Sequence, residues 1–97
     1  MEIVPVENVR GSHKTGSLYS TTIEQINEML GFEPNKKGSA DMKVVNCWNF
    51  TVFVENVGEC ECSIWDWKGS QLANTFSTYG DHFIFSELFG ARYYSAP

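Results

Sequence analysis

Residues 43–67 read KVVNCWNFTVFVENVGECECSIWDW, and this stretch decides the fold. Two runs within it, residues 43–54 and 59–67, alternate apolar with polar side chains, which is typical of β-strands. Between them lies Asn56-Val57-Gly58, which has the composition of a three-residue hairpin turn. We expect Gly58 to adopt a positive φ angle, because glycine has no Cβ atom to oppose it. The stretch therefore predicts an antiparallel hairpin at the centre of the fold.

The pairing of the two strands follows from the same pattern. We expect three pairs of opposed residues: Val54 with Cys60, Val52 with Cys62, and Phe50 with Ile64. This register gathers apolar side chains on one face, whereas a shift by one residue would scatter them over both faces. The other face then carries Trp65 and Trp67, because alternation places both on the same side of their strand.

Helix signals flank the hairpin. The segment Thr21-Thr22-Ile23-Glu24 has the form of a capping box, with Thr21 as the cap and Glu24 as its partner, and Gly31 supplies a stop. A turn at residues 68–70 leads into a third strand over about residues 72–79. Asp81 is then placed to cap a second helix over residues 82–89, which Gly90 ends.

The resulting order of elements, α-β-β-β-α, predicts an α+β fold of two layers. One layer is a three-stranded antiparallel meander, and both helices cover its apolar face. With 97 residues the chain is expected to form a single domain. Its core would span residues 19–90, with residues 1–18 as an arm or an extra strand and residues 91–97 as a tail.

Composition narrows the functional classes. The net charge of −5 argues against direct binding of nucleic acid, because such proteins need a basic stripe to neutralise phosphates. An acidic surface instead suits a partner protein with a basic groove. The sequence has no apolar run long enough to cross a bilayer, and Met1–Pro5 lacks the character of a signal peptide. Together with three cysteines, an odd number, this predicts a cytoplasmic protein with no membrane contact.

The chain is poorly supplied for catalysis and metal binding. Its two histidines, His13 and His82, lie in a polar arm and at a helix start, and no glycine-rich phosphate loop follows a strand. Cys60 and Cys62 point into the predicted core, and their spacing matches no common zinc knuckle. We therefore expect no catalytic residue, no metal site and no cofactor, and hence no enzyme.

An acidic and aromatic face of the hairpin is the candidate site. The predicted partner-binding residues are the acidic Glu55, Glu59, Glu61 and Asp66 and the aromatic Trp65, Trp67 and Tyr79. Tryptophan and tyrosine are common anchors of protein interfaces, and exposed charges steer the encounter. Two structural interpretations stay open: a charged edge that prevents sheet aggregation, and a second core layer covered by residues 1–18 or by the tail.

Several motifs, taken together, resemble small uncharacterised proteins encoded by bacteriophages. They are TIEQIN at residues 22–27, LGFEP at 30–34, IWDWKGS at 64–70, FSTYG at 76–80 and LFG at 88–90, covering about residues 19–90. No catalytic residue is attached to that group. In size, charge and topology the chain is similar to host-defence antagonists such as anti-CRISPR proteins, some of which occupy nucleic-acid grooves with acidic faces.

The resemblance implies a phage-type accessory protein in the cytoplasm of a host cell. Such a protein would bind and block a host protein with a basic groove, for instance a defence nuclease or other nucleic-acid-binding machinery. The alternative is a structural or homo-oligomeric phage component that self-assembles through the tryptophan face.

Overall fold

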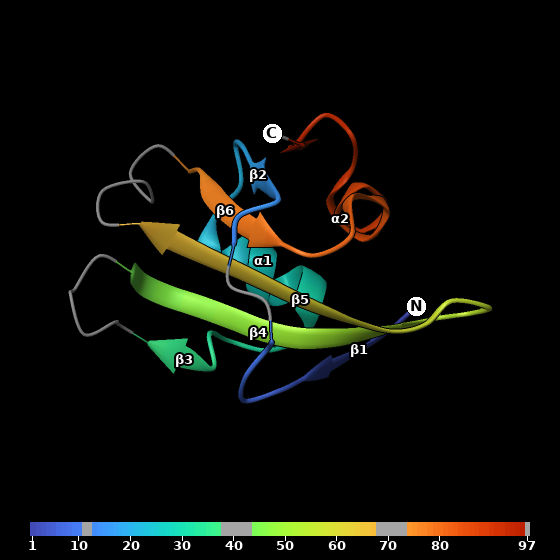
Figure 1. Ribbon diagram of the computed structural model, residues 1–97. Coiled ribbons are helices and arrows are strands. Elements are labelled where there is room, and N and C mark those ends of the chain that lie inside the picture. Colours follow the sequence, from blue (N-terminus) through green and yellow to red (C-terminus); the bar gives the residue numbers. More distant parts are fainter. Residues whose placement is uncertain (11–12, 38–43, 68–73, 97) are drawn as a thin grey trace.

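The computed structural model describes residues 1–10, 13–37, 44–67 and 74–96 (Figure 1). The elements follow one another as β1 (Glu2–Pro5), β2 (Gly16–Leu18), α1 (Ile23–Leu30), β3 (Lys36–Lys37), β4 (Val44–Val54), β5 (Gly58–Trp67), β6 (Phe76–Tyr79), α2 (His82–Phe89) and β7 (Tyr94–Ser95). The strands form one antiparallel sheet with the order β1-β4-β5-β6-β2-β7, and β3 also pairs with β4. The fold is therefore α+β, as the sequence predicts.

The predicted meander is the centre of this sheet, since β4, β5 and β6 are consecutive neighbours. Both helices pack on one of its faces. From α1, the Asn27 Oδ1 atom accepts a hydrogen bond of 2.9 Å from Trp48 Nε1 on β4. From α2, the ring of Phe85 lies 6.4 Å from that of Phe50, also on β4. The core lies between these helices and the sheet, and its fully buried large side chains include Trp48, Phe50, Phe76 and Phe85.

The capping box at α1 is shifted by one residue from the predicted one. Thr22 Oγ1 accepts from the Gln25 N–H at 3.1 Å, and Gln25 Oε1 accepts from the Thr22 N–H at 2.8 Å. Thr21 is buried, and its hydroxyl donates to the Tyr19 carbonyl at 2.8 Å instead. The reason is that Thr22-x-x-Gln25 satisfies the same motif, so the sequence offers two overlapping boxes. Two other predicted boundaries are confirmed: α1 ends at Gly31, which has φ 85°, and α2 begins after its cap Asp81.

The β4–β5 register differs from the predicted one by two residues. Val54 lies opposite Gly58, Val52 opposite Cys60 and Phe50 opposite Cys62. The turn therefore consists of Glu55, Asn56 and Val57, with positive φ at Asn56 (68°) and, as predicted, at Gly58 (102°). A shift by two preserves the faces, because side chains alternate with a period of two. The apolar face was therefore predicted correctly although the pairs were not.

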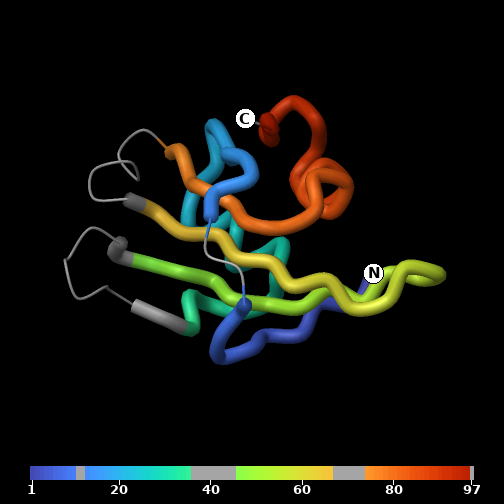
Figure 2. Tube along the Cα trace, in the orientation of Figure 1, coloured from blue at the N-terminus to red at the C-terminus, as the bar shows by residue number. Residues whose placement is uncertain are grey.

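The N-terminal residues extend the sheet on both sides rather than forming a free arm. β1 pairs with β4 at one edge, whereas β2 pairs with β6 on the far side of the meander. Of the chain between them, residues 6–10 lie against β4 and β5 (Figure 2), where the Glu7 carbonyl accepts from Asn49 Nδ2 and the Arg10 N–H donates to Glu61 Oε2. These contacts lie on the sheet face turned away from the helices. We call this the outer face. The tail also joins the sheet, because β7 pairs with β2. The predicted turn at residues 68–70 and the predicted start of β6 at Leu72 lie outside the described residues.

Candidate partner-binding face

The middle of the outer face is a buried polar layer. Asn49, Thr51 and Ser63 are only 3–4 % exposed. Asn49 Oδ1 accepts from Ser63 Oγ at 2.8 Å, and Asn49 Nδ2 donates to the Glu7 carbonyl at 3.2 Å. The bond to Glu7 ties the crossing segment, by which we mean residues 6–10 and 13–15, to the sheet. This part of the face therefore matches the second-layer interpretation and is closed to a partner.

Asn35 fixes the point where the crossing segment leaves β1. Its Nδ2 atom donates to the carbonyls of Val6 (2.8 Å) and Asn49 (2.9 Å), and its Oδ1 atom accepts from the Asn49 N–H (2.9 Å). The amide thus takes the place of a backbone partner between two strands, and it satisfies groups that would otherwise lose their ladder bonds.

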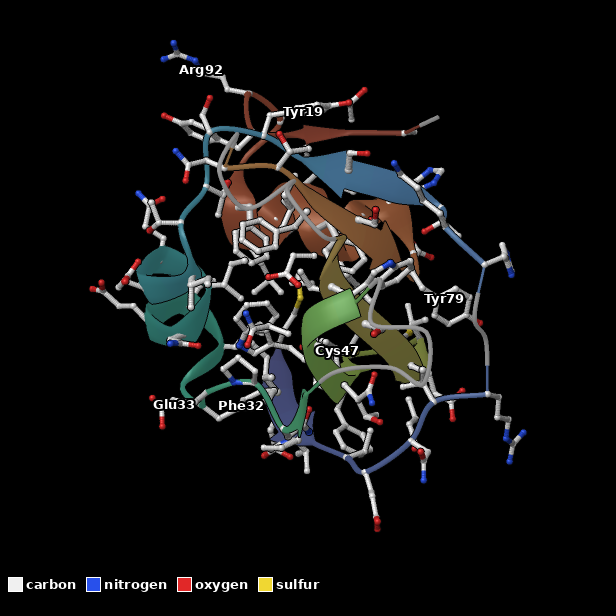
Figure 3. The ribbon with its side chains drawn as sticks, turned by 90° about the vertical axis from the view of Figure 1, so that its left-hand side faces the viewer. Tyr19, Phe32, Glu33, Cys47, Tyr79 and Arg92 are labelled. Carbon is white, nitrogen blue, oxygen red and sulfur yellow. The ribbon has the colours of Figure 1, made fainter. Side chains whose placement is uncertain are left out.

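The aromatic residues of the predicted site are partly covered. Trp65 lies opposite Cys47 and Ser77 in the sheet and is half-buried. Tyr79 is also half-buried, and His13 of the crossing segment contacts its ring edge-on at a centroid distance of 5.2 Å. Figure 3 shows Tyr79 on the side of the sheet away from α1, toward the chain that precedes β2. Trp67 lies opposite Val44 through its backbone, and its side chain lies outside what the structure describes.

Asp66 corrects the predicted acidic cluster, because it is fully buried rather than exposed beside the hairpin turn. It follows Ile64 by two positions and so lies on the helix side of β5. Its Oδ1 atom accepts from the Asn46 N–H at 2.7 Å, and its Oδ2 atom accepts from Asn46 Nδ2 at 3.0 Å. The ladder between β4 and β5 is irregular between Val44 and Cys47, which explains the need for an acceptor there.

Glu61 already has a partner in its own chain. Its Oε2 atom accepts from the Arg10 N–H at 2.9 Å, and its Oε1 atom lies 4.0 Å from Arg10 Nε. The Glu61 side chain is 30 % exposed and that of Arg10 is 95 % exposed. A shallow depression of about 400 Å³ is lined by these two residues with Glu59 and Tyr79. An ion pair this exposed contributes at most about 1 kcal/mol to stability, so a partner can displace it at little cost.

The exposed part of the predicted site lies at the hairpin end. Glu55 and Glu59 are both exposed, and between them Val57 is 68 % exposed at the turn. Phe53, opposite Glu59, is 43 % exposed, and Glu2 of β1 lies opposite Phe53 on its other side. Figure 1 shows this end of the hairpin projecting beyond the rest of the fold, with the N-terminus beside it. We call these five residues the hairpin tip surface.

Phe53 was not among the predicted partner-binding residues, and sequence reasoning also missed Glu2 and Val57 as members of this surface. The pairing of β1 with β4 is carried by four residues, which is too short a run to show a period. Val57 was assigned only to the turn. The alternation of apolar and polar residues does not extend into a turn, so it does not indicate whether a side chain there is exposed.

A groove lies on the helix side of the sheet, away from the outer face. Its volume is about 430 Å³, and it lies between α1 and the residues around the end of α2. Met29 of α1 and Tyr93 after α2 line it, and they are 44 % and 41 % exposed. Glu28 adds a carboxylate to its wall. It is concave and partly apolar, but it shares no residue with the predicted site.

Cys62 lies in the core, and its side chain is fully buried. Burial, with the nearby Cys60 and Asp81, raises the pKa of the Cys62 thiol from 9.0 to about 12, so this thiol is a poor nucleophile. Within the described ranges, no three His, Cys, Asp or Glu side chains are grouped so that they would hold a metal ion. No helix in the described part is both long and apolar enough to cross a membrane.

Comparison of the chain with protein-family models, with curated proteins and with solved structures gave no match. The hairpin tip surface and its chemistry are therefore the basis for assigning a function.

Proposed function

We propose that this chain is a phage-type accessory protein that binds a host protein with a basic groove and blocks it, without catalytic turnover. The blocked protein would be a defence nuclease or other nucleic-acid-binding machinery in the host cytoplasm. The observation that carries the proposal is the projecting hairpin end, where the sheet register places an exposed Phe53 between Glu2 and Glu59.

The shape of this surface supports occlusion. A narrow prong that extends from a compact body can enter a groove that a flat surface cannot, and here the charged side chains at its tip, Glu2, Glu55 and Glu59, are all acidic. Carboxylates occupy the sites on lysine and arginine that phosphates would otherwise take. A partner that binds this prong would therefore lose access to nucleic acid.

The residues divide between steering and anchoring. Glu55 and Glu59 are exposed and free to attract a basic surface at a distance, which mainly increases the association rate. Phe53 and Val57 supply apolar area that is removed from water on contact, which mainly slows dissociation. Tyr79 holds the crossing segment through its ring contact with His13, and Asp66 joins β5 to β4 through Asn46 at the opposite end of the hairpin.

Capture of a partner tests the proposal, provided that the charge reversal has a matched control. The wild-type chain and the E55K/E59K variant would be used to capture proteins from a host bacterial lysate. The E24K/E87K variant has the same charge change on exposed positions of α1 and α2. We expect one host protein to be captured by wild type and by E24K/E87K but not by E55K/E59K.

The captured protein would then be purified and bound to DNA or RNA in competition with the chain. We expect the chain to displace the nucleic acid. Equal capture by all three variants would contradict the hairpin tip surface as the site, and simultaneous binding of chain and nucleic acid would contradict occlusion.

Self-assembly through the Trp65 and Trp67 face is the alternative function. It is less well supported, because residues 6–10 lie against the middle of that face through Glu7 and Arg10. Light scattering after size-exclusion chromatography distinguishes the two: the blocking function predicts the mass of a single chain for the wild-type protein, whereas self-assembly predicts a multiple of it.

A further inference from the structure

We infer that the hairpin tip surface recognises a single arginine side chain of its partner, held over the ring of Phe53 between Glu2 and Glu59. This inference rests on the proposed function, because it assigns the chemical group that the same surface binds.

The sheet register places the three side chains in one row. Glu2 of β1, Phe53 of β4 and Glu59 of β5 are direct cross-strand neighbours, and all three project on the outer face. Neighbouring strands are about 4.8 Å apart, so the two glutamates flank the ring with their backbones about 10 Å from each other. A planar cation that lies on the ring is therefore within reach of a carboxylate on each side.

Arginine fits this row better than lysine. Its guanidinium group is planar, stacks on an aromatic face, and presents donors along more than one edge to carboxylates. A lysine ammonium is a compact charge that stays hydrated and does not stack. Val57, which is 68 % exposed at the turn, extends the apolar contact for a side chain next to the arginine.

The chain itself shows that this part of the outer face accepts arginine. Arg10 lies against Glu61, two residues along β5 from Glu59, and both glutamates line the same depression as Arg10. Among the described residues, the Arg10–Glu61 contact is the ion pair that the structure contains, and Glu2 and Glu59 have no cation within 4.0 Å. The row around Phe53 has the acceptors and the ring but no intramolecular arginine.

A peptide titration followed by NMR tests the inference with defined probes. The probe is acetyl-Leu-Arg-Leu-amide. Its controls are the same peptide with citrulline, which has the shape of arginine without the charge, and with lysine. We expect the arginine peptide to shift the backbone amide signals of Glu2, Phe53 and Glu59 in a saturable way. Binding of the lysine peptide should be at least about threefold weaker, and the citrulline peptide should cause no saturable shift.

Two variants separate the ring from the charges. F53L keeps an apolar side chain but removes the ring, and E59Q keeps the shape but removes a charge. Each substitution should weaken binding of the arginine peptide at least about threefold. The control F83L replaces an exposed phenylalanine of α2 and should leave the affinity for this peptide unchanged. The spectrum of each variant reports whether it is folded.

Equal shifts with arginine and citrulline peptides, or shifts confined to residues outside the row, would overturn the inference. This result is distinguishable from failure of the proposed function. If a host protein is captured through the tip but the arginine peptide does not bind, the blocking function stands and the arginine inference fails. If the arginine peptide binds but no host protein is captured, the recognition site stands and the blocking function fails.

Discussion

Asp66 accepts hydrogen bonds from both the backbone N–H and the side-chain amide of Asn46, at 2.7 and 3.0 Å, in a position with no exposed surface. This carboxylate joins β4 and β5 where their ladder is irregular. Its role is structural, and it holds the end of the hairpin that is opposite to the tip.

Replacement of Asp66 by alanine should lower the free energy of unfolding by about 1–3 kcal/mol, because it leaves two partly buried donors of Asn46 without their acceptor. Urea denaturation measures this loss. The control is Glu55→Ala, which removes an exposed carboxylate and should change stability by less than about 0.5 kcal/mol. Equal stability of the two variants would show that Asp66 is not a structural acceptor.

Asn35 links the stability of β1 to the composition of the hairpin tip surface. Alanine at this position removes three hydrogen bonds to Val6 and Asn49 and should speed hydrogen exchange of the β1 amides at least tenfold. Because β1 contributes Glu2, binding of a basic partner should weaken although no tip residue has changed. Glu33→Ala, an exposed neighbour, is the control. Unchanged exchange in β1 would mean that the strand is held by its ladder alone.

The pH dependence of stability should carry a contribution from Cys62. Its folded pKa, raised by burial to about 12, exceeds the unfolded value of 9.0. The unfolded state therefore loses this proton first, so the contribution is complete below about pH 9 and is lost as the pH rises toward about 12. The free energy of unfolding of wild type should fall over this window more steeply than that of Cys62→Ala. Parallel curves would contradict a buried, protonated thiol.

The central hairpin was predictable because its signal is long. Alternation over β4 and β5 identified the buried face, including Trp48 and Ile64, and Gly58 marked the turn. The pair assignments were wrong by two residues because such a shift leaves the face pattern unchanged. The helix stops and the Asp81 cap were predictable from local residue chemistry, whereas Thr21 and Thr22 both fit the first cap.

The rest of the sheet could not be predicted because its strands are short. β1, β2 and β7 have four, three and two residues, and their partners are decided by tertiary packing. The candidate site could not be fully predicted for the same reason. Burial of Asp66, coverage of the outer face by residues 6–10 and the place of Glu2 beside Phe53 all follow from long-range pairing.

The dissociation constant of the Phe53→Ser variant for the captured host protein tests the central claim most directly. Phe53 is 43 % exposed, so its replacement should leave the fold intact, and Phe83→Ser, at 53 % exposure on α2, is the matched control. If the hairpin tip surface is the binding site, Phe53→Ser should bind at least about thirtyfold more weakly, a loss of about 2 kcal/mol, while Phe83→Ser should bind like wild type. Wild-type affinity of a folded Phe53→Ser variant would contradict the account.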